Sequence, residues 1–258
     1  MVDAVNLPRT PSLRLDGKTA LVTGAGRGLG VACAAALAEA GAHVTLLSRT
    51  EREIAEVAKA IVSGGGAADW IVADVTDPVA VAAALTERPP FDVLVNNAGT
   101  NRPAPFLDVT TADFDAVMSL NVRATYFVSQ AVARGLAVAA RGGSIIHMSS
   151  QMGHVGAAAR TVYCASKHAI EGLTKAMAVD LGPLGIRVNS IGPTFIKTKL
   201  TKPFLDDPVF RAESLGKSKI GRFGVVEDIM GAVVFLASDA SSLMTGTAIV
   251  IDGGWTAD

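Results

Sequence analysis

The chain has 258 residues, half of them hydrophobic and 18% charged, and a formal net charge of −1 at pH 7. This length allows a single large α/β domain with an extensive core. The near-neutral charge gives no basis for nucleic acid or an anionic membrane as a partner. No apolar run approaches the roughly 18 residues that a membrane-spanning helix needs.

Cysteine content and the N-terminal residues indicate the compartment. The two cysteines, Cys33 and Cys164, can form at most one disulfide, and no Cys/His spacing suggests a metal site. Residues 1–15 contain prolines and charges but no apolar stretch of the kind found in signal peptides. We therefore expect a cytoplasmic protein without a bound metal.

Short apolar segments alternate with segments of helical spacing along the whole chain. In chain order the pattern predicts strand 19–23, helix 31–40, strand 44–47, helix 51–62, strand 70–73, helix 78–85, strand 92–95, helix 113–136, strand 144–148, helix 162–181, strand 186–191, helix 226–237 and strand 248–251. Repeated strand–helix–strand units predict right-handed crossovers. The expected fold is α/β: one doubly wound, Rossmann-like parallel sheet of about seven strands with helices on both faces.

One segment interrupts this alternation. Residues 193–222 are rich in Lys, Asp, Pro and Thr and show no clean period. Long irregular segments in compact domains often serve as lids, so we expect a lid at about 194–222. We expect residues 1–14 to form an N-terminal extension and residues 15–258 to form a single domain.

The first strand leads into a glycine-rich turn. Gly24, Gly28 and Gly30 follow a GxxxGxG spacing, which differs from the common GxGxxG fingerprint and from a P-loop. Glycines let the backbone turn sharply, and the N-terminus of the following helix can bind a pyrophosphate. The turn predicts a dinucleotide site; the alternative is a tight strand–helix turn without a ligand.

The end of the second strand bears on which dinucleotide is bound. An acidic residue there would bind the ribose hydroxyls of NAD, but this chain has Ser48 and Arg49. Arg49, together with Arg27 in the glycine turn, can pair with a 2′-phosphate, which favours NADP over NAD. Glu51 lies nearby and opposes this interpretation, and both arginines can alternatively be solvated surface charges. Asp74 is a candidate acceptor for the adenine amine or, alternatively, a helix cap.

Tyr163 and Lys167 are spaced four apart at the start of a predicted helix, so they share one face. A cation near a tyrosine favours the phenolate, so we expect the pKa of Tyr163 to fall towards the range of a general acid/base. Such a pair alone is weak evidence, since many surface helices contain it by chance.

The surrounding motifs make the pair informative. Residues 23–30 (TGAGRGLG), 96–99 (NNAG), Asn121, residues 149–150 (SS), Tyr163 with Lys167, Asn189 with Pro193, and the tail at 244–254 occur in this order. Over roughly residues 15–255 the chain resembles the classical short-chain dehydrogenase/reductase family. The resemblance implies an enzyme that uses NAD(P) to interconvert a secondary alcohol and a ketone, in a homotetramer.

The family implies a role for each catalytic candidate. Ser150 would hold the substrate oxygen by a hydrogen bond, and Tyr163 would donate or remove the proton. Lys167 would bind the nicotinamide ribose and lower the pKa of Tyr163. Asn121 would distort its helix locally and hold a water that connects Lys167 to solvent. Two hydroxyl donors and one cation suit the negative charge that hydride transfer builds on one oxygen.

The cofactor set expected from the turn and the resemblance spans both ends of the dinucleotide. Asn96, Ala98 and Gly99 would lie along the adenosine side, and Ile196 and Thr198 would meet the nicotinamide carboxamide. The full expected set is Gly24, Arg27, Gly28, Leu29, Gly30, Ser48, Arg49, Asp74, Val75, Asn96, Ala98, Gly99, Tyr163, Lys167, Pro193, Ile196 and Thr198. Thr194 departs from the family, which usually has glycine after this proline, so the turn against the nicotinamide is expected to differ.

Substrate contacts are expected from loops beyond the carboxyl ends of the strands. The candidates, mostly polar, are Asn101, Arg102, Gln151, His154, Arg160 and Thr194. A polar pocket favours a small hydroxylated substrate such as a sugar, polyol or hydroxy acid, and His154 and Arg160 are candidates for binding an anionic group. The lid aromatics Phe195, Phe204 and Phe210, with Leu205, can cover the substrate or, alternatively, pack in a subunit contact.

Two other functions are compatible with parts of the pattern. A 3-oxoacyl thioester reductase would use the same constellation, but no obvious basic patch for an acyl carrier is present. A dinucleotide-sensing protein without turnover would be expected to lack Tyr163, Lys167 or Ser150, and all three are present.

Overall fold

The computed structural model describes residues 6–257; residues 1–5, part of the expected N-terminal extension, and residue 258 lie outside the described residues. In the described chain seven strands form one parallel sheet in the order β3-β2-β1-β4-β5-β6-β7. The strands are β1 (Thr19–Thr23), β2 (His43–Ser48), β3 (Ala67–Val72), β4 (Val93–Asn96), β5 (Gly143–Met148), β6 (Ile186–Pro193) and β7 (Ala248–Ile251). The α/β class and the parallel sheet expected from the sequence are confirmed.

The helices connect these strands. They are α1 (Leu29–Glu39), α2 (Glu51–Ser63), α3 (Pro78–Thr86), α4 (Thr111–Met118), α5 (Thr125–Val138), α6 (Thr161–Leu181), α7 (Lys202–Leu205), α8 (Pro208–Lys217) and α9 (Glu227–Ala237). A π-helical segment, η2 (Ser119–Ala124), joins α4 to α5, and short 3-10 segments are η1 (Phe106–Asp108), η3 (Gln151–Gly153), η4 (Gly182–Leu184), η5 (Asp239–Ser241) and η6 (Trp255–Ala257). No helix in residues 6–257 combines the length and the apolar character needed to cross a membrane.

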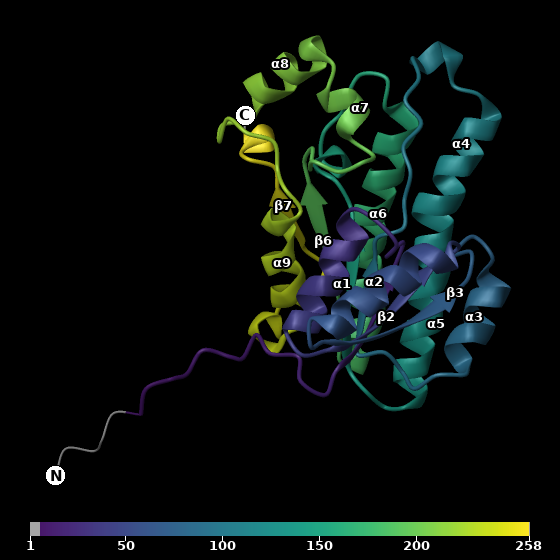
Figure 1. Cartoon of the computed structure of the whole chain (residues 1–258), viewed down its shortest axis with the longest axis vertical. Helices are drawn as coiled ribbons and strands as arrows, with labels where there is room; N and C mark the ends of the chain where they lie inside the picture. The colour runs from purple at the N-terminus through teal and green to yellow at the C-terminus, as the bar shows by residue number, and fades with distance from the viewer. Residues whose placement is uncertain (1–5, 258) are drawn as a thin grey trace.

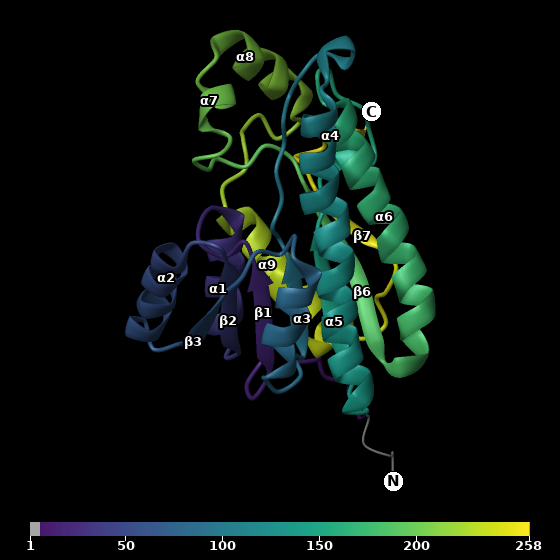
Figure 2. The ribbon, with the colours of Figure 1, turned by 90° about the vertical axis from the view of Figure 1, so that its right-hand side faces the viewer.

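The sheet is buried on both faces because side chains alternate along each strand. Val22, Val44 and Leu46 face one core cluster, which is completed by apolar residues of α1, α2 and α9. Leu21 and Leu47 face the other, completed by α3, α5 and α6. Figure 2 shows α5 and α6 side by side along this second face. The near-continuous apolar strands seen in the sequence are thus strands covered on both sides.

The strand order reverses between β1 and β4, where ligands bind in open α/β sheets. The carboxyl end of β6 points towards α7 and α8, which lie beyond that edge of the sheet (Figure 1). Residues 6–14 are exposed, whereas Leu15 is only 1% exposed and donates its N–H to Ala40 O. The packed domain therefore begins at about Leu15.

Two features differ from the sequence prediction. The segment at 194–222, expected to be irregular, contains the short helices α7 and α8, both begun by a proline in the first turn. Strand β3 begins at Ala67, three residues before the predicted start, because residues 67–69 pair with His43, Val44 and Thr45 of β2. Pairing with a neighbouring strand overrides the low β-propensity of two alanines.

Candidate active site

The glycine turn after β1 has the geometry of a phosphate-binding turn. Gly24 and Gly28 have φ angles of +63° and +58°, in the left-handed region that favours glycine. A Cβ on Gly30 would lie 2.3 Å from the main-chain oxygen of Gly24, so only glycine fits there. Helix α1 begins at Leu29 without a side-chain cap, so its first N–H groups remain available for an anion.

Thr23 and Asn97 hold this turn against β4, and the sequence analysis missed this role for both. Asn97 Nδ2 donates to the main-chain oxygens of Thr23 (3.0 Å) and Gly24 (3.1 Å), and Thr23 Oγ1 accepts from the N–H groups of Asn97 and Ala98. Asn96 instead donates to Ser129 Oγ at 2.8 Å and is 4% exposed. The alternation of side chains along a strand was the available signal, because it sends neighbouring asparagines to opposite sides.

The residues expected to select the dinucleotide gather beyond β2 and β3. Arg49 Nη1 lies 3.4 Å from Asp74 Oδ2, and 72% of the Arg49 side chain is exposed. Asp74 also accepts from the N–H and the hydroxyl of Thr76, which lowers its pKa despite the opposing effect of burial. Ser48 Oγ accepts from the N–H of Thr50 at 3.3 Å. Arg27 is exposed in the glycine turn, and Val75, next to Asp74, is buried.

An acidic side chain that the sequence analysis did not consider lies beside the glycine turn. A Cβ on Gly26 would be 2.8 Å from Glu53 Oε2, so the Glu53 carboxylate covers this part of the turn. It opposes binding of a second negative charge here. Arg27 and Arg49 therefore favour binding of a 2′-phosphate, and the Glu53 carboxylate disfavours it.

Ser150, the residue before η3, and Tyr163, in the first turn of α6, are brought together. Their side chains are close enough for Ser150 to affect the ionisation of Tyr163, and Ser150 Oγ accepts from the N–H of Met152 at 3.1 Å. Burial raises the pKa of Tyr163 above its ordinary value, and the neighbouring Ser150 hydroxyl lowers it by a smaller amount. The expectation of a depressed pKa is wrong for the protein alone, because desolvation of the phenolate outweighs the effects of Ser150 and of the Arg160 charge.

Lys167 and Asn121 lie behind this pair. Lys167 Nζ is 5.6 Å from the centroid of the Tyr163 ring and donates to the main-chain oxygen of Met148 at 2.8 Å. Burial lowers the pKa of Lys167 to about 8, with a smaller opposing effect from Glu171. A Cβ on Gly99 would lie 3.3 Å from Asn121 Oδ1 and 3.9 Å from Lys167 Nζ, so both side chains converge on Gly99.

Asn121 lies in the π-helical segment η2, which is the local helix distortion that the resemblance implies. Its Oδ1 accepts from the N–H of Thr100 at 2.8 Å, and its Nδ2 donates to Thr100 O (2.9 Å) and Ser166 Oγ (3.0 Å). Asn121 therefore joins η2, the loop after β4 and α6 into one rigid frame.

The residues expected near the nicotinamide follow β6. Thr194 donates its N–H to Ile251 O at 3.1 Å, and the only non-glycine residues with positive φ in the described chain are Ala140 and Ala159. The turn after Pro193 therefore accommodates threonine without backbone strain. Ile196 is 3% exposed and its side chain packs in the core, so only its main chain is available to a ligand. Thr198 Oγ1 lies 3.2 Å from Thr201 Oγ1.

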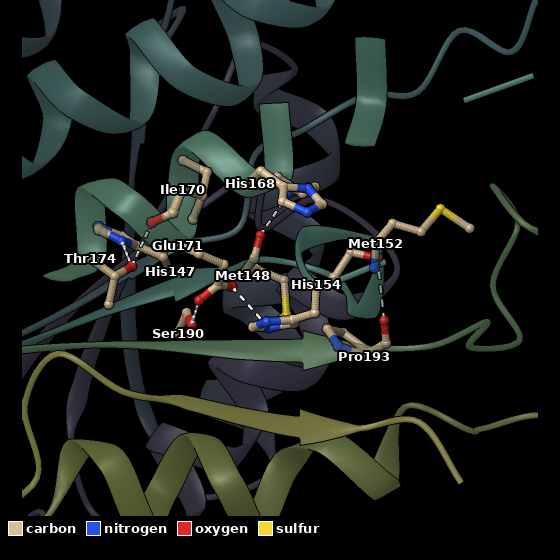
Figure 3. Close-up of polar contacts among 12 residues, drawn as sticks. His147, Met148, Met152, His154, His168, Ile170, Glu171, Thr174, Ser190 and Pro193 are labelled. Carbon is tan, nitrogen blue, oxygen red and sulfur yellow. Dashed lines mark hydrogen bonds and ion pairs between the residues drawn. The ribbon is translucent and has the colours of Figure 1, made fainter. Parts of the chain in front are cut away.

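Two of the expected substrate residues already have ion-pair partners. Arg102 Nη1 lies 2.7 Å from Asp113 Oδ1. His154 Nε2 lies 3.6 Å from Oε1 of Glu171, a buried carboxylate whose Oε2 accepts from Ser190 at 2.8 Å. Figure 3 shows His154 and Ser190 on either side of Glu171. Glu171 was missed in the sequence, where 16 residues separate it from His154 and no local spacing reveals the pair.

Other expected substrate residues keep unused polar atoms. Gln151 is 1% exposed and its Oε1 has no hydrogen-bond partner, as is true of Asn101 Oδ1 and Thr194 Oγ1. Arg160 is 8% exposed and its guanidinium lies 5.0 Å from the centroid of the Phe204 ring. Buried polar atoms without partners are unusual in folded proteins and are candidates for ligand contacts.

The expected lid segment, residues 194–222, packs through its aromatic residues. The Phe195 and Phe210 rings meet edge to face at 5.1 Å, Phe204 lies 6.1 Å from Phe210, and Phe195 lies 5.7 Å from Trp255. The expected lid aromatics therefore form one cluster with the C-terminal Trp255, which the sequence analysis had not included.

Taken together, these groups fit a nicotinamide dinucleotide. Gly24 and Gly28, with their left-handed backbone, and the uncapped N-terminus of α1 provide a binding site for a pyrophosphate. Ala98 and Gly99 connect this site to the catalytic candidates, because Ala98 lies against Gly24 and Gly99 lies near Lys167. A hydroxyl pair backed by a buried cation can exchange a proton with a carbonyl or alcohol oxygen.

Comparison with known proteins supports this assignment. The family model described as enoyl-(acyl carrier protein) reductase matches residues 24–256. L-xylulose reductase from Bos taurus is 41% identical over 245 residues, covering 95% of this chain and 99% of that protein. Gluconate 5-dehydrogenase from Gluconobacter oxydans (strain 621H) is 39% identical over 246 residues, covering 94% and 96%. A crystal structure of gluconate 5-dehydrogenase from Burkholderia cenocepacia J2315, in complex with NADP and tartrate, has a TM-score of 0.93 and 37% identity, covering 95% and 98%.

The chain belongs to the short-chain dehydrogenase/reductase family. The enzyme class expected from the sequence, an NAD(P)-dependent oxidoreductase that acts on CH–OH groups, is confirmed by these relatives.

Proposed function

We propose that this enzyme interconverts a secondary alcohol and a ketone on a sugar, polyol or sugar acid, with NADP(H) preferred over NAD(H). The observation that carries the proposal is the cluster of Ser150, Tyr163 and the buried Lys167, whose Nζ lies 5.6 Å from the centroid of the Tyr163 ring. The similarity to L-xylulose reductase and gluconate 5-dehydrogenase supports the polyhydroxylated substrate class. The presence of NADP in the solved relative supports the cofactor.

In this proposal the bound cofactor supplies or accepts the hydride at its nicotinamide ring. Ser150 Oγ donates a hydrogen bond to the substrate oxygen and holds it beside the Tyr163 hydroxyl. Tyr163 donates its proton to that oxygen in reduction and removes it in oxidation. Lys167, cationic at neutral pH, stabilises the phenolate that forms when Tyr163 has given up its proton.

All of the expected site residues are part of the proposal. Asn121 holds the loop at Thr100 and α6 in place around Lys167. Gly24, Gly28, Leu29 and Gly30 bind the pyrophosphate, with Arg27, Ser48, Arg49, Asp74, Val75, Asn96, Ala98 and Gly99 along the adenosine and Pro193, Ile196 and Thr198 towards the nicotinamide. Asn101, Arg102, Gln151, His154, Arg160 and Thr194 surround the substrate beneath the lid at 194–222.

We further propose a cytoplasmic homotetramer. Cys33 and Cys164 are both buried and unpaired, as is usual in a reducing compartment. Exposed apolar side chains on α5 and α6 and near β7, such as Tyr126, Val179 and Leu243, are suited to subunit contacts.

Fluorescence titration with NADPH and with NADH tests the cofactor preference. NADPH should bind more tightly, and Arg49→Ala should weaken NADPH binding by about tenfold or more, because a charge-assisted hydrogen bond contributes about 1.5–3 kcal/mol. NADH binding should change little. Arg134→Ala, a substitution of an exposed arginine on α5, is the matched control. Tighter binding of NADH by the unmodified enzyme would contradict the NADP assignment.

Turnover of a panel of polyols, ketoses and aldonates tests the substrate class. Oxidation of at least one polyol or aldonate with NADP+ should depend on Tyr163. Turnover confined to a 3-oxoacyl thioester would instead support the acyl reductase alternative.

A further inference from the structure

Arg160, the residue directly before α6, is a buried cation without a counter-charge. Arg160 is 8% exposed, and no carboxylate in residues 6–257 forms an ion pair with its guanidinium. The single hydrogen bond of its guanidinium goes from Nη1 to the main-chain oxygen of Ala159, at a long 3.3 Å. Burying an unpaired charge is costly, so a site that does so is suited to an anionic partner supplied from outside.

The guanidinium is held in place rather than free. It lies 5.0 Å from the centroid of the Phe204 ring of α7, a cation–π arrangement that fixes its position beneath the lid. The preceding residue, Ala159, has a φ of +53°, which is unfavourable for alanine, and its carbonyl also accepts from the N–H of Ala104. Backbone strain held by surrounding contacts often marks a functional position.

Arg160 also lies close to the reacting groups. It directly precedes α6, three residues before Tyr163, and its charge interacts with the Tyr163 hydroxyl. The unpartnered Oε1 of buried Gln151 belongs to η3, which begins next to Ser150. A polyhydroxylated chain whose alcohol is held by Ser150 and Tyr163 would find both a cation and a hydrogen-bond acceptor nearby.

The other cationic candidates of the pocket are already engaged. Arg102 pairs with Asp113, and His154 pairs with Glu171. Lys167 donates to Met148 and is assigned to the proton transfer. One planar guanidinium can bind one carboxylate through two parallel hydrogen bonds.

We propose that Arg160, held by Phe204, binds the carboxylate of the substrate and makes this enzyme selective for polyhydroxy acids over neutral polyols. This inference rests on the proposed function and assigns its substrate class. In this proposal a single side chain distinguishes polyhydroxy acids from neutral polyols, which carry similar hydroxyl groups.

D-gluconate and D-glucitol form the test pair, since they differ only in a carboxylate in place of a hydroxymethyl group. The ratio of kcat/KM for gluconate to that for glucitol should exceed 10 in the unmodified enzyme and fall at least tenfold in Arg160→Gln, mainly through KM for gluconate. Arg160→Lys should restore part of the ratio. Arg211→Gln, which removes an arginine of segment 194–222 that also lies over an aromatic ring, should leave the ratio unchanged.

A second readout does not need turnover. In the presence of saturating NADP+, gluconate should raise the Tm of the unmodified enzyme more than glucitol does, and Arg160→Gln should abolish the difference. Phe204→Leu keeps the charge of Arg160 but removes the ring that holds it. This variant should need a several-fold higher gluconate concentration to reach the same increase in Tm.

The outcomes separate the two proposals. An enzyme that oxidises glucitol as well as gluconate, with an unchanged ratio in Arg160→Gln, would overturn the inference and leave the proposed function intact. An enzyme that binds NADPH but oxidises neither compound would contradict the proposed function for these substrates. The Tm measurement would then still decide on Arg160, because equal stabilisation by both compounds overturns the carboxylate assignment.

Discussion

Lys167 Nζ donates a 2.8 Å hydrogen bond to the main-chain oxygen of Met148, the last residue of β5. The bond joins α6 to the sheet where the strand leads into Ser149 and Ser150. The lysine is thereby held 5.6 Å from the Tyr163 ring, at the cost of burying its charge. Its partner is a neutral carbonyl, so the ammonium group remains a net positive charge within the site.

Replacing Lys167 by methionine should change the pH dependence of stability. Burial lowers the pKa of Lys167 from 10.5 to about 8 in the folded protein, so the charged form is disfavoured by folding. The penalty is full below pH 8 and disappears as the pH rises through 8 to 10.5, which corresponds to up to about 3 kcal/mol. The stability of the unmodified protein should therefore rise relative to Lys167→Met between pH 8 and 10.5.

Urea unfolding of both proteins at several pH values measures this difference. Lys175→Met, which replaces an exposed lysine of the same helix, is the control and should follow the unmodified protein. A difference between Lys167→Met and the unmodified protein that is constant with pH would show that the folded protein does not disfavour the Lys167 charge.

Tyr163→Phe should lower kcat by about 10²–10⁴-fold while leaving NADPH binding within a few-fold. The raised pKa of Tyr163 keeps the phenol protonated at neutral pH, the form needed to donate a proton in reduction. Oxidation needs the deprotonated form, so kcat/KM for the alcohol should increase with pH between 7 and 10. Tyr126→Phe, which alters the other tyrosine of the chain, should behave as the unmodified enzyme.

A flat pH profile for oxidation in the unmodified enzyme would mean that another group removes the proton. Steady-state rates in both directions across this pH range, with NADPH binding measured in parallel, make the distinction.

Gly30→Ala should disrupt the dinucleotide turn, because the new Cβ would lie 2.3 Å from Gly24 O and 2.7 Å from Asn97 Nδ2. We expect a loss of NADPH binding of at least tenfold and a lower Tm. Gly172→Ala is the matched control, since no atom lies within 4 Å of its added Cβ, and it should stabilise α6 by about 0.5–1 kcal/mol. Equal binding by both variants would show that the turn can shift to accept a side chain.

Asn97→Ala should loosen the same turn from the other side. The substitution removes the hydrogen bonds to Thr23 O and Gly24 O and leaves these carbonyls without that donor. The free energy of unfolding should fall by about 1–3 kcal/mol, and NADPH binding should weaken in parallel. Calorimetry and fluorescence titration check this, and an unchanged NADPH affinity would mean that Asn97 serves the fold alone.

The sequence contained enough information for the sheet and for the helices that cover it. Their apolar residues recur with a regular period because each faces a core, as Ile54 and Ala58 of α2 do. Helices α7 and α8 gave no such signal. Phe195, Phe204 and Phe210 pack on one another and Trp255 rather than on the sheet, so their spacing follows no single helix face.

For the site, the motif spacing located the candidates but not their environment. The rise in the Tyr163 pKa and the fall in that of Lys167 come mainly from burial, which depends on packing between distant segments. The pairs His154–Glu171 and Arg102–Asp113, like the absence of a partner for Arg160 within residues 6–257, likewise arise only when separate loops meet. Residue type and spacing along the chain do not predict contacts between segments that are distant in the sequence.

The contact between Phe195 and Trp255 gives the protein an intrinsic optical reporter. The chain has two tryptophans, and Trp70 lies on the edge strand β3, far along the sheet order from β6 and β7. A Trp70→Phe variant would leave the indole of Trp255 as the single emitter, packed against the aromatic cluster of the lid. Its emission would then follow movement of that cluster directly, without any label attached to the chain.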